Sequence, residues 1–227
     1  MAFFDQLNNL DTRWLLGING SHSDFFDTFF AFFTSKETWI PLYLVLLVVI
    51  FTKYRRTGIW VALALILTIV LSDQLSGLIK VLVQRLRPSH AIALKGLLNL
   101  PVGEGGLYGF VSSHAANSFA LAVVAASISK SRRIWAIMII WATLNAYSRI
   151  YVGVHYPFDV LCGAILGLLI GWGMYRLILI FDNRILRKKM AYAGRWKDKH
   201  KTPVVITFVM ITLTLLITAM LVGKYNL

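Results

Sequence analysis

The stretch from Pro203 to Val222 holds twenty consecutive residues without a charge. A run of that length matches the hydrocarbon thickness that an α-helix must cross to span a bilayer. Apolar residues make up 58% of the 227 positions, and the mean hydropathy is +0.69, far above that of soluble domains. The sequence therefore predicts an all-α integral membrane protein, with Thr202 as the N-cap of this last helix.

Apolar runs separated by short polar segments predict six transmembrane helices. We expect them at about 38–53, 58–80, 112–129, 134–148, 157–181 and 203–222. Residues 1–36 are too polar to span, and their apolar side chains recur at helical spacing, which predicts an interfacial amphipathic segment. The remaining expected parts are a transmembrane core at 37–181, a basic loop at 182–202, and a terminal helix with its tail at 203–227.

Basic residues gather in three loops between these runs. Of 23 Lys and Arg, three lie at 53–56, three at 130–133 and eight at 182–202. With six spans these loops share one face, which the positive-inside rule makes cytoplasmic. This distribution does not favour a nucleic-acid-binding surface, despite the net charge of +13. Both termini, the long 81–111 loop and the turn at 149–156 are expected on the outer face.

The segment from Ser148 to Asp159 places a guanidinium, an imidazole and a carboxylate within twelve residues. Pro157 suits the first turn of the next helix, so His155 lies at the helix mouth and Asp159 about one turn inside. A carboxylate in that position can orient an imidazole, and Arg149 can bind a phosphate. We interpret His155 as a nucleophile directed at phosphorus; a purely structural His–Asp hydrogen bond is the alternative.

Two further clusters carry similar chemistry. Lys80 closes an apolar run, and Arg87 follows before Pro88; snorkelling of these cations to the interface is the alternative, and Arg85 is expected to be a surface charge. Ser112, Ser113 and His114 open the third span, where free backbone N–H groups favour an anion. Ser112 can cap that helix and donate to a phosphate, and His114 can protonate a departing alkoxide. An ordinary capped helix with an interfacial histidine remains the alternative.

Together these residues predict a cation-rich bowl at the membrane surface, suited to a lipid phosphate. The cations would repel a divalent ion, so no metal is expected. Asp73 precedes Lys80 by seven residues, about 10 Å deeper on the same helix face. We expect it to pair with a basic residue of the site, with a polar helix contact or a catalytic role as alternatives. Gly163, Gly167 and Gly171 predict close helix packing within the chain rather than a dimer seam.

The three motifs resemble those of the type 2 phosphatidic acid phosphatases, also called lipid phosphate phosphatases. That family's signatures read Lys-x6-Arg-Pro, Pro-Ser-Gly-His and Ser-Arg-x5-His-x3-Asp. The first matches Lys80–Pro88 and the third matches Ser148–Asp159, whereas the second is altered, with Val111 in place of Pro and Ser113 in place of Gly. The resemblance covers roughly residues 57–181.

The resemblance implies a role for each matching residue. His155 would attack phosphorus and form a phosphohistidine, Asp159 would orient it, and His114 would protonate the leaving group. The phosphoryl oxygens would be held by Lys80, Arg87, Ser112 and Arg149. Ser113, which departs from the family's glycine, is expected to add a hydroxyl donor to this group. Neither a metal nor another cofactor is implied.

The implied activity is removal of a phosphate monoester or pyrophosphate from a lipid at the extracytoplasmic leaflet of a bacterial inner membrane. Candidate substrates are undecaprenyl diphosphate, phosphatidylglycerol phosphate, phosphatidate and a lipid A phosphate, and the sequence does not choose among them. The expected partners are this lipid and the surrounding membrane lipids, with no nucleic acid, and a monomer is favoured. The alternatives are a non-catalytic lipid or anion transporter and an inactive binding relative.

Overall fold

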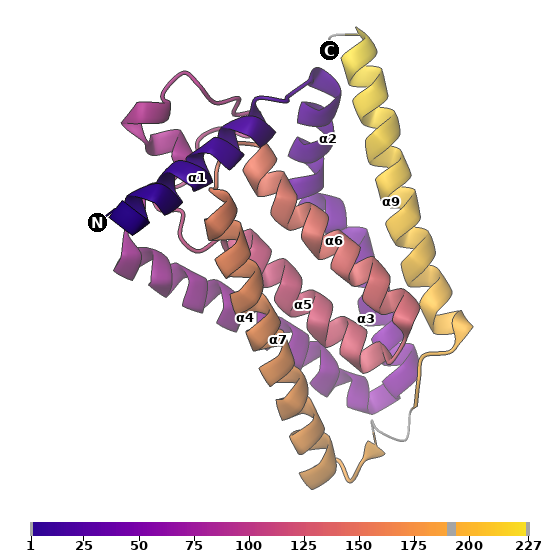
Figure 1. Ribbon diagram of the computed structural model, residues 1–227. Helices are drawn as coiled ribbons and strands as arrows, with labels where there is room; N and C mark the ends of the chain where they lie inside the picture. The colour runs from indigo at the N-terminus through magenta and orange to yellow at the C-terminus, as the bar shows by residue number, and fades with distance from the viewer. Residues whose placement is uncertain (1, 190–193, 226–227) are drawn as a thin grey trace.

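The computed structural model describes residues 2–189 and 194–225, which form a helical bundle (Figure 1). Its main elements are α1 (Ala2–Asn19), α2 (Asp24–Thr34), α3 (Ile40–Tyr54), α4 (Gly58–Val83), α5 (Ser113–Ser129), α6 (Arg132–Tyr151), α7 (Pro157–Arg184) and α9 (Asp198–Tyr225). Short 3₁₀ turns join some of them, at Glu37–Trp39, Arg55–Thr57, Pro88–His90 and Ile92–Leu94. Each predicted apolar run coincides with one of the helices α3 to α9.

The boundaries differ from the sequence prediction mainly at the last helix. The expected N-cap at Thr202 was wrong, because α9 already begins at Asp198 and contains Pro203. Asp198 lies in the first turn, where a carboxylate interacts favourably with the helix dipole, and it pairs with Lys201 at 2.8 Å. The helix therefore extends into the segment that was expected to be the end of the basic loop.

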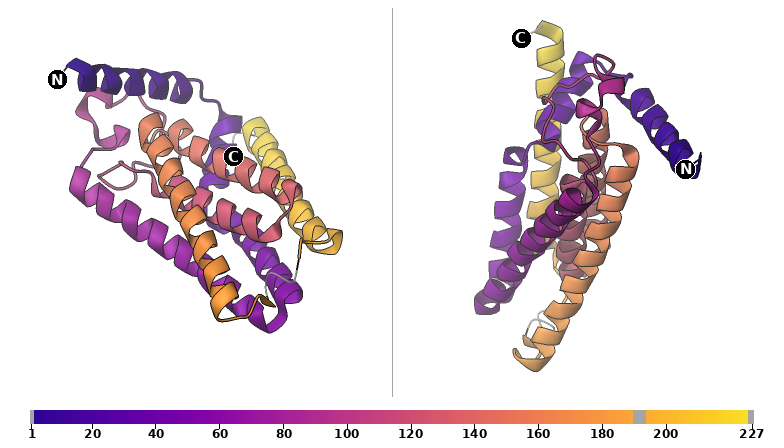
Figure 2. Two further views of the ribbon diagram at one scale, coloured as in Figure 1. Left: turned by 60° about the horizontal axis from the view of Figure 1, so that its bottom comes forward. Right: turned by 90° about the vertical axis from the view of Figure 1, so that its left-hand side faces the viewer.

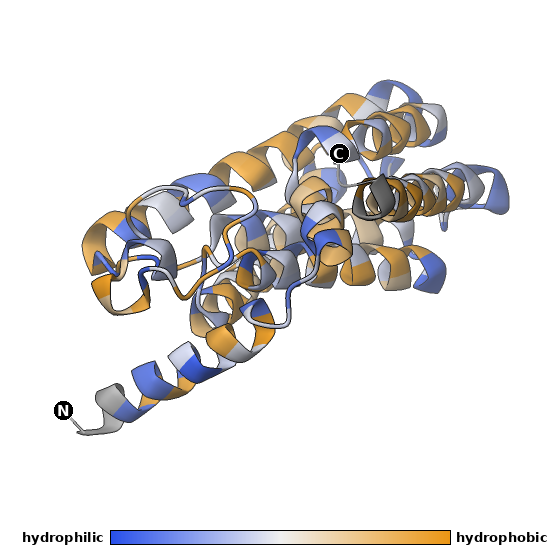
Figure 3. Cartoon of the chain, turned by 90° about the horizontal axis from the view of Figure 1, so that it is seen from above, coloured by the Kyte–Doolittle hydropathy of each residue, from blue (hydrophilic) through white to orange (hydrophobic). Residues whose placement is uncertain are grey.

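Three stretches of the described chain are long and apolar enough to cross a membrane. They are Glu37–Val83, which contains both α3 and α4, then Pro157–Arg184 and Asp198–Val222, while Ser113–Ser129 is a shorter apolar helix. Seen from above, hydrophobic residues run along the bundle helices, and hydrophilic residues gather at their ends and along α1 (Figure 3). The division into six spans remains a prediction.

The packing of α5 against α7 holds the centre of the bundle together. A Cβ atom at Gly163 would lie 2.5 Å from the Ser112 carbonyl oxygen, and one at Gly171 would lie 2.7 Å from that of Ala120. Between them, a Cβ at Gly167 would strike the backbone of Ala116. The glycine repeat thus lets the two backbones approach closely, which confirms the prediction of packing within the chain.

The two N-terminal helices have different surroundings. Phe29, Phe30 and Phe33 of α2 are buried in the main hydrophobic core, so these side chains do not face a membrane surface. Helix α1 lies across the end of the bundle (Figure 2), with Asp11 and Leu15 buried against it and Trp14 exposed. Helix α1 lies on the bundle with Trp14 exposed, whereas α2 is partly built into the core and exposes only Phe26 and Phe32 of its phenylalanines, so α1 fits the expected interfacial helix better.

The three basic loops lie at one end of the bundle, opposite α1 (Figure 1). The Arg195 Nε donates to the Lys130 carbonyl at 2.7 Å, and Lys53 Nζ donates to the Arg195 carbonyl at 3.4 Å. Residues from all three loops are thus in contact. This geometry agrees with the common face that the positive-inside argument requires.

Candidate active site

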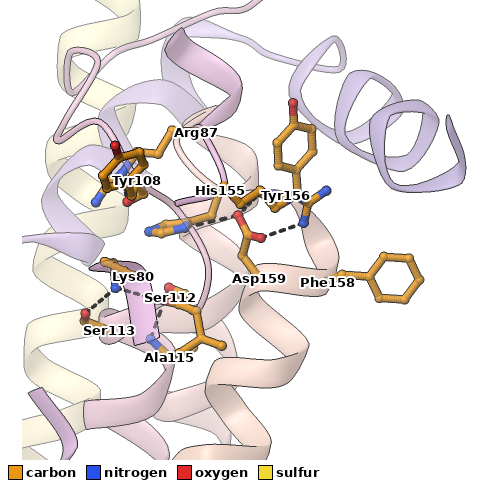
Figure 4. Close-up of polar contacts among 12 residues, drawn as sticks. Lys80, Arg87, Tyr108, Ser112, Ser113, Ala115, His155, Tyr156, Phe158 and Asp159 are labelled. Atoms are coloured by element: carbon orange, nitrogen blue, oxygen red, sulfur yellow. Dashed lines mark hydrogen bonds and ion pairs between the residues drawn. The ribbon is translucent and has the colours of Figure 1, made fainter. Parts of the chain in front are cut away.

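The three motifs converge at the end of the bundle opposite the basic loops. The site is formed by the C-terminal end of α4, the loop 84–112, the N-terminus of α5 and the turn between α6 and α7 together with the first turn of α7 (Figure 4). Lys80, Arg87, Ser112, His155 and Asp159 come from these four segments and lie together. The sequence prediction that residues from separate helix ends meet here is therefore confirmed for this group.

His155 and Asp159 form a buried pair. The imidazole Nδ1 lies 3.5 Å from the Asp159 Oδ2, and the two side chains are 1% and 0% exposed. Pro157 starts α7, and Asp159 closes a capping box by accepting a hydrogen bond from the Tyr156 N–H at 3.1 Å. The helix start thus fixes the carboxylate beside the imidazole.

The environment of His155 favours its neutral form. Burial lowers the pKa of His155 well below its usual value, and the charges of Arg87, Arg149 and Lys80 lower it further. A neutral imidazole carries the lone pair that nucleophilic attack requires. The same three cations are close enough to act on the ring, so an anionic substrate would be attracted to this place.

Arg85 is not a surface charge, and that prediction was wrong. Its guanidinium donates to Asp159 Oδ1 at 2.7 Å and to Asp11 Oδ2 at 2.7 Å, and it stacks over the Tyr156 ring at 4.2 Å. Asp11 also accepts a hydrogen bond from the Phe158 N–H at 2.9 Å. Helix α1 is thereby connected to the carboxylate that faces His155. Sequence reasoning missed this because the only signal was one acid, Asp11, within the apolar face of a distant helix.

The remaining cations are less neutralised. Arg149 is 7% exposed, donates to Thr34 Oγ1 at 2.7 Å, and has a buried Nε without a hydrogen-bond partner in the described part of the chain. Arg87 Nε donates to the Tyr108 carbonyl at 3.2 Å, and its guanidinium approaches Gly105 closely. Among residues 2–189 and 194–225, neither arginine forms an ion pair with a carboxylate. Both retain donors for an anion.

Ser112 and Ser113 organise the start of α5. Ser112 is its N-cap, as predicted, and accepts a hydrogen bond from the Ala115 N–H at 3.5 Å, while its own N–H donates to the Asp159 carbonyl at 2.9 Å. Ser113 Oγ accepts from Lys80 Nζ at 2.6 Å and from Ser76 Oγ at 2.7 Å. Lys80 also donates to the Val111 carbonyl. The serine that replaces glycine in the second motif thus positions the lysine.

His114 lies between this site and a neighbouring cavity. It is close enough to Arg149 and His155 for their charges to act on its ring, and it also lines a cavity of about 450 Å³. Lys36, which sequence reasoning missed, lines the same cavity. Its position just after the end of α2 carried no motif, so only the tertiary fold brings it here.

Asp73 does not pair with a cation as expected. Within the described residues it forms no ion pair, and its Oδ1 accepts a hydrogen bond from Asn117 Nδ2 at 3.3 Å instead. The alternative of a polar helix contact is therefore the observed one. Asp73 is exposed on α4 and lines the cavity, so water or a polar group can solvate its charge.

A buried imidazole beside a carboxylate, with unneutralised cations nearby, is an arrangement suited to phosphoryl transfer. Such a reaction depends mainly on positioning and on stabilisation of the charged transition state. In a hydrophobic helical bundle, this combination defines a membrane-embedded phosphatase.

Comparison with known proteins agrees with this class. Residues 57–183 match the model of the PAP2 superfamily. A lipid A 4'-phosphatase of Bacteroides thetaiotaomicron is 35% identical over 91% of this chain and 93% of its own length. The chain belongs to the PAP2 superfamily and is a metal-independent membrane lipid phosphatase.

Two crystal structures share the fold. That of Aquifex aeolicus LpxE is 30% identical, with a TM-score of 0.56, and the match covers 74% of this chain and 95% of that one. The transmembrane PAP2-type phosphatidylglycerolphosphate phosphatase of Bacillus subtilis has a TM-score of 0.59 at 22% identity, covering 79% and 88%. The second likeness concerns the fold alone.

Proposed function

We propose that this enzyme removes a phosphate monoester from a glycolipid of the lipid A type, through a phosphohistidine on His155. The observation that carries the proposal is the buried His155–Asp159 pair, with Nδ1 and Oδ2 3.5 Å apart, close to arginines that form no ion pair with a carboxylate among the described residues. The substrate class is supported by the 35% identity to a lipid A 4'-phosphatase over nearly the whole chain.

The first step is an in-line attack by the His155 Nε2 on phosphorus. Asp159 stabilises the positive charge that develops on the ring, because its Oδ2 faces the other ring nitrogen. The negative charge on the phosphoryl oxygens is stabilised by Arg87, Arg149 and Lys80. Ser113 positions the lysine by accepting a hydrogen bond from its Nζ.

His114 protonates the oxygen of the departing lipid alcohol. The same imidazole, then neutral, takes a proton from the water that attacks the phosphohistidine, which releases inorganic phosphate and restores His155. The two histidines therefore have different roles, with His155 buried at the phosphate and His114 at the border of the cavity.

We further propose six spans, with the site at the extracytoplasmic face of a bacterial inner membrane. The three basic loops in contact at the opposite end support this orientation under the positive-inside rule. In this orientation the site would lie at the level of the head groups, and the substrate would enter from the outer leaflet.

The test uses purified protein in mixed micelles with a lipid A 4'-phosphate, and measures released phosphate with and without a chelator. Undecaprenyl diphosphate, phosphatidylglycerol phosphate and phosphatidate serve as competing substrates. We expect the glycolipid to have the highest kcat/KM, unaffected by the chelator. Preference for another lipid would refute the substrate class, and no release from any lipid would favour a non-catalytic carrier.

A further inference from the structure

The cavity beside His114 contains an unusual set of buried polar atoms. The Asn145 Nδ2, the Trp141 Nε1 and the Asn117 Oδ1 all lack hydrogen-bond partners within the described residues, and all three side chains line this cavity. Asn145 is 4% exposed and Trp141 is 2% exposed. Buried polar groups without partners destabilise a fold, and in native proteins they usually have a functional reason. The residues that carry these three atoms all line one cavity, which points to a polar ligand there.

The position of the cavity identifies which part of a substrate would occupy it. His114 and Ser113 line it, whereas His155 and Asp159 do not. If His155 attacks phosphorus and His114 protonates the leaving oxygen, the leaving group must lie on the His114 side. The cavity therefore lies on the side where the departing alcohol is expected.

The lining also indicates the chemistry of that alcohol. Three amide side chains, of Gln74, Asn117 and Asn145, supply donors and acceptors, and the aromatic rings of Trp39, Tyr43 and Trp141 supply flat apolar surfaces. A pocket of about 450 Å³ falls within the range of small-molecule sites, which commonly combine apolar walls with a few polar groups. This composition suits a sugar ring, which presents hydroxyl and amide groups at its edge and C–H groups on its faces.

We propose that this cavity binds the sugar that bears the scissile phosphate, and that Asn117, Trp141 and Asn145 determine specificity for a glycosyl leaving group. Asn145 Nδ2 and Trp141 Nε1 donate to hydroxyl or acyl carbonyl oxygens, and Asn117 Oδ1 accepts from a hydroxyl or an amide N–H. The proposal rests on the proposed function, because it assumes the roles of His155 and His114. A glycerol or prenyl group would leave these buried atoms unpaired, which penalises its binding.

The test compares two substrates that share a phosphate monoester and differ in the alcohol: an acylated glucosamine 4-phosphate and phosphatidate. The measured quantity is the ratio of their kcat/KM values. Asn145→Leu removes the amide at similar size, and Trp141→Phe removes one donor while keeping an aromatic ring. Each should lower the sugar-to-glycerol ratio about tenfold, as expected for a lost buried hydrogen bond.

Ser72→Ala is the matched control. The Ser72 Oγ is also buried without a partner in the described chain, but Ser72 does not line the cavity, so this variant should keep the wild-type ratio. Thermal unfolding of all variants in detergent identifies any that fail to fold. If Asn145→Leu does not fold, Trp141→Phe provides the test of the ratio. An unchanged ratio in a folded cavity variant would overturn the sugar subsite. Failure of the wild type to hydrolyse the sugar phosphate would instead refute the proposed function.

Discussion

Both ends of the bundle have several cations, but these cations differ in their solvent exposure and in their ion pairing. At the basic end, Arg133 is 78% exposed and lies 4.0 Å from Asp198, itself 80% exposed. At the other end, Arg149 is 7% exposed and forms no ion pair with a carboxylate among the described residues. Exposed ion pairs contribute little free energy, whereas a buried unneutralised guanidinium is costly. The first end is suited to setting orientation in the membrane, and the second to binding an anion.

The strongest test of this contrast substitutes one arginine at each end. Arg149→Gln should lower kcat/KM at least about 100-fold, because it removes a charge that stabilises the transition state in a buried site. Arg133→Gln should leave kcat/KM within about twofold, since its ion pair is exposed. Equal effects of the two substitutions on phosphate release would eliminate the distinction between the ends.

A smaller effect is expected at Arg85, which acts on Asp159 and not on the substrate. Arg85→Gln should lower kcat about tenfold and change KM little, because it loosens the carboxylate that orients His155. Asp11→Asn should have the same signature, since Asp11 holds the other side of that guanidinium. A pure loss of protein stability, with unchanged kcat in the folded fraction, would show that the Asp11–Arg85–Asp159 chain is only structural.

The pH profile reports on the charges around His155. The neutral form of His155 is the reactive one. Its lowered pKa keeps that form populated at pH values below the ordinary histidine pKa of about 6.5. Substituting Arg87 by Gln removes a nearby positive charge, so the pKa of His155 should rise and the acid limb of kcat should move to higher pH. Comparison with the wild type on the same substrate cancels the ionisation of the substrate itself. A shift to lower pH would contradict this sign.

The smallest effect concerns the packing of α7 against α5, the helix that Ser112 caps and that carries His114. Gly167→Ala should destabilise the protein by about 1–3 kcal/mol, because its Cβ would strike the Ala116 backbone of α5. Gly173→Ala, which like Gly167 lies on α7, is the matched control, since nothing lies within 4 Å of a Cβ there. Thermal unfolding in detergent should show a lower Tm for the first variant only. Equal Tm values would mean that α5 and α7 can separate without cost.

The local sequence was sufficient to predict those parts of the site that depend on a single helix end. The His155–Asp159 spacing, the Ser112 cap and the glycine repeat of α7 all followed from helical geometry, and the structure contains each of them. The roles of Arg85 and Asp73 were not predictable in this way. Their partners, Asp11 and Asn117, lie 74 and 44 residues away, and only the packing of α1 and α5 brings them into contact.

Residues at the cavity were missed for a similar reason. Asn145 and Trp141 lie within an apolar run that is typical of a transmembrane helix. Neither side chain has a charge that would indicate a functional role. Their significance depends on whether a neighbouring helix supplies a hydrogen-bond partner, which periodicity does not report.

The most direct measurement is rapid-quench labelling with a lipid substrate that carries a ³²P phosphate. The enzyme should acquire acid-labile, base-stable label within the first turnover, on the peptide that contains His155, and His155→Ala should acquire none while remaining folded. Label on any other residue, or phosphate release by His155→Ala at a rate near that of the wild type, would contradict the assignment of His155 as the nucleophile.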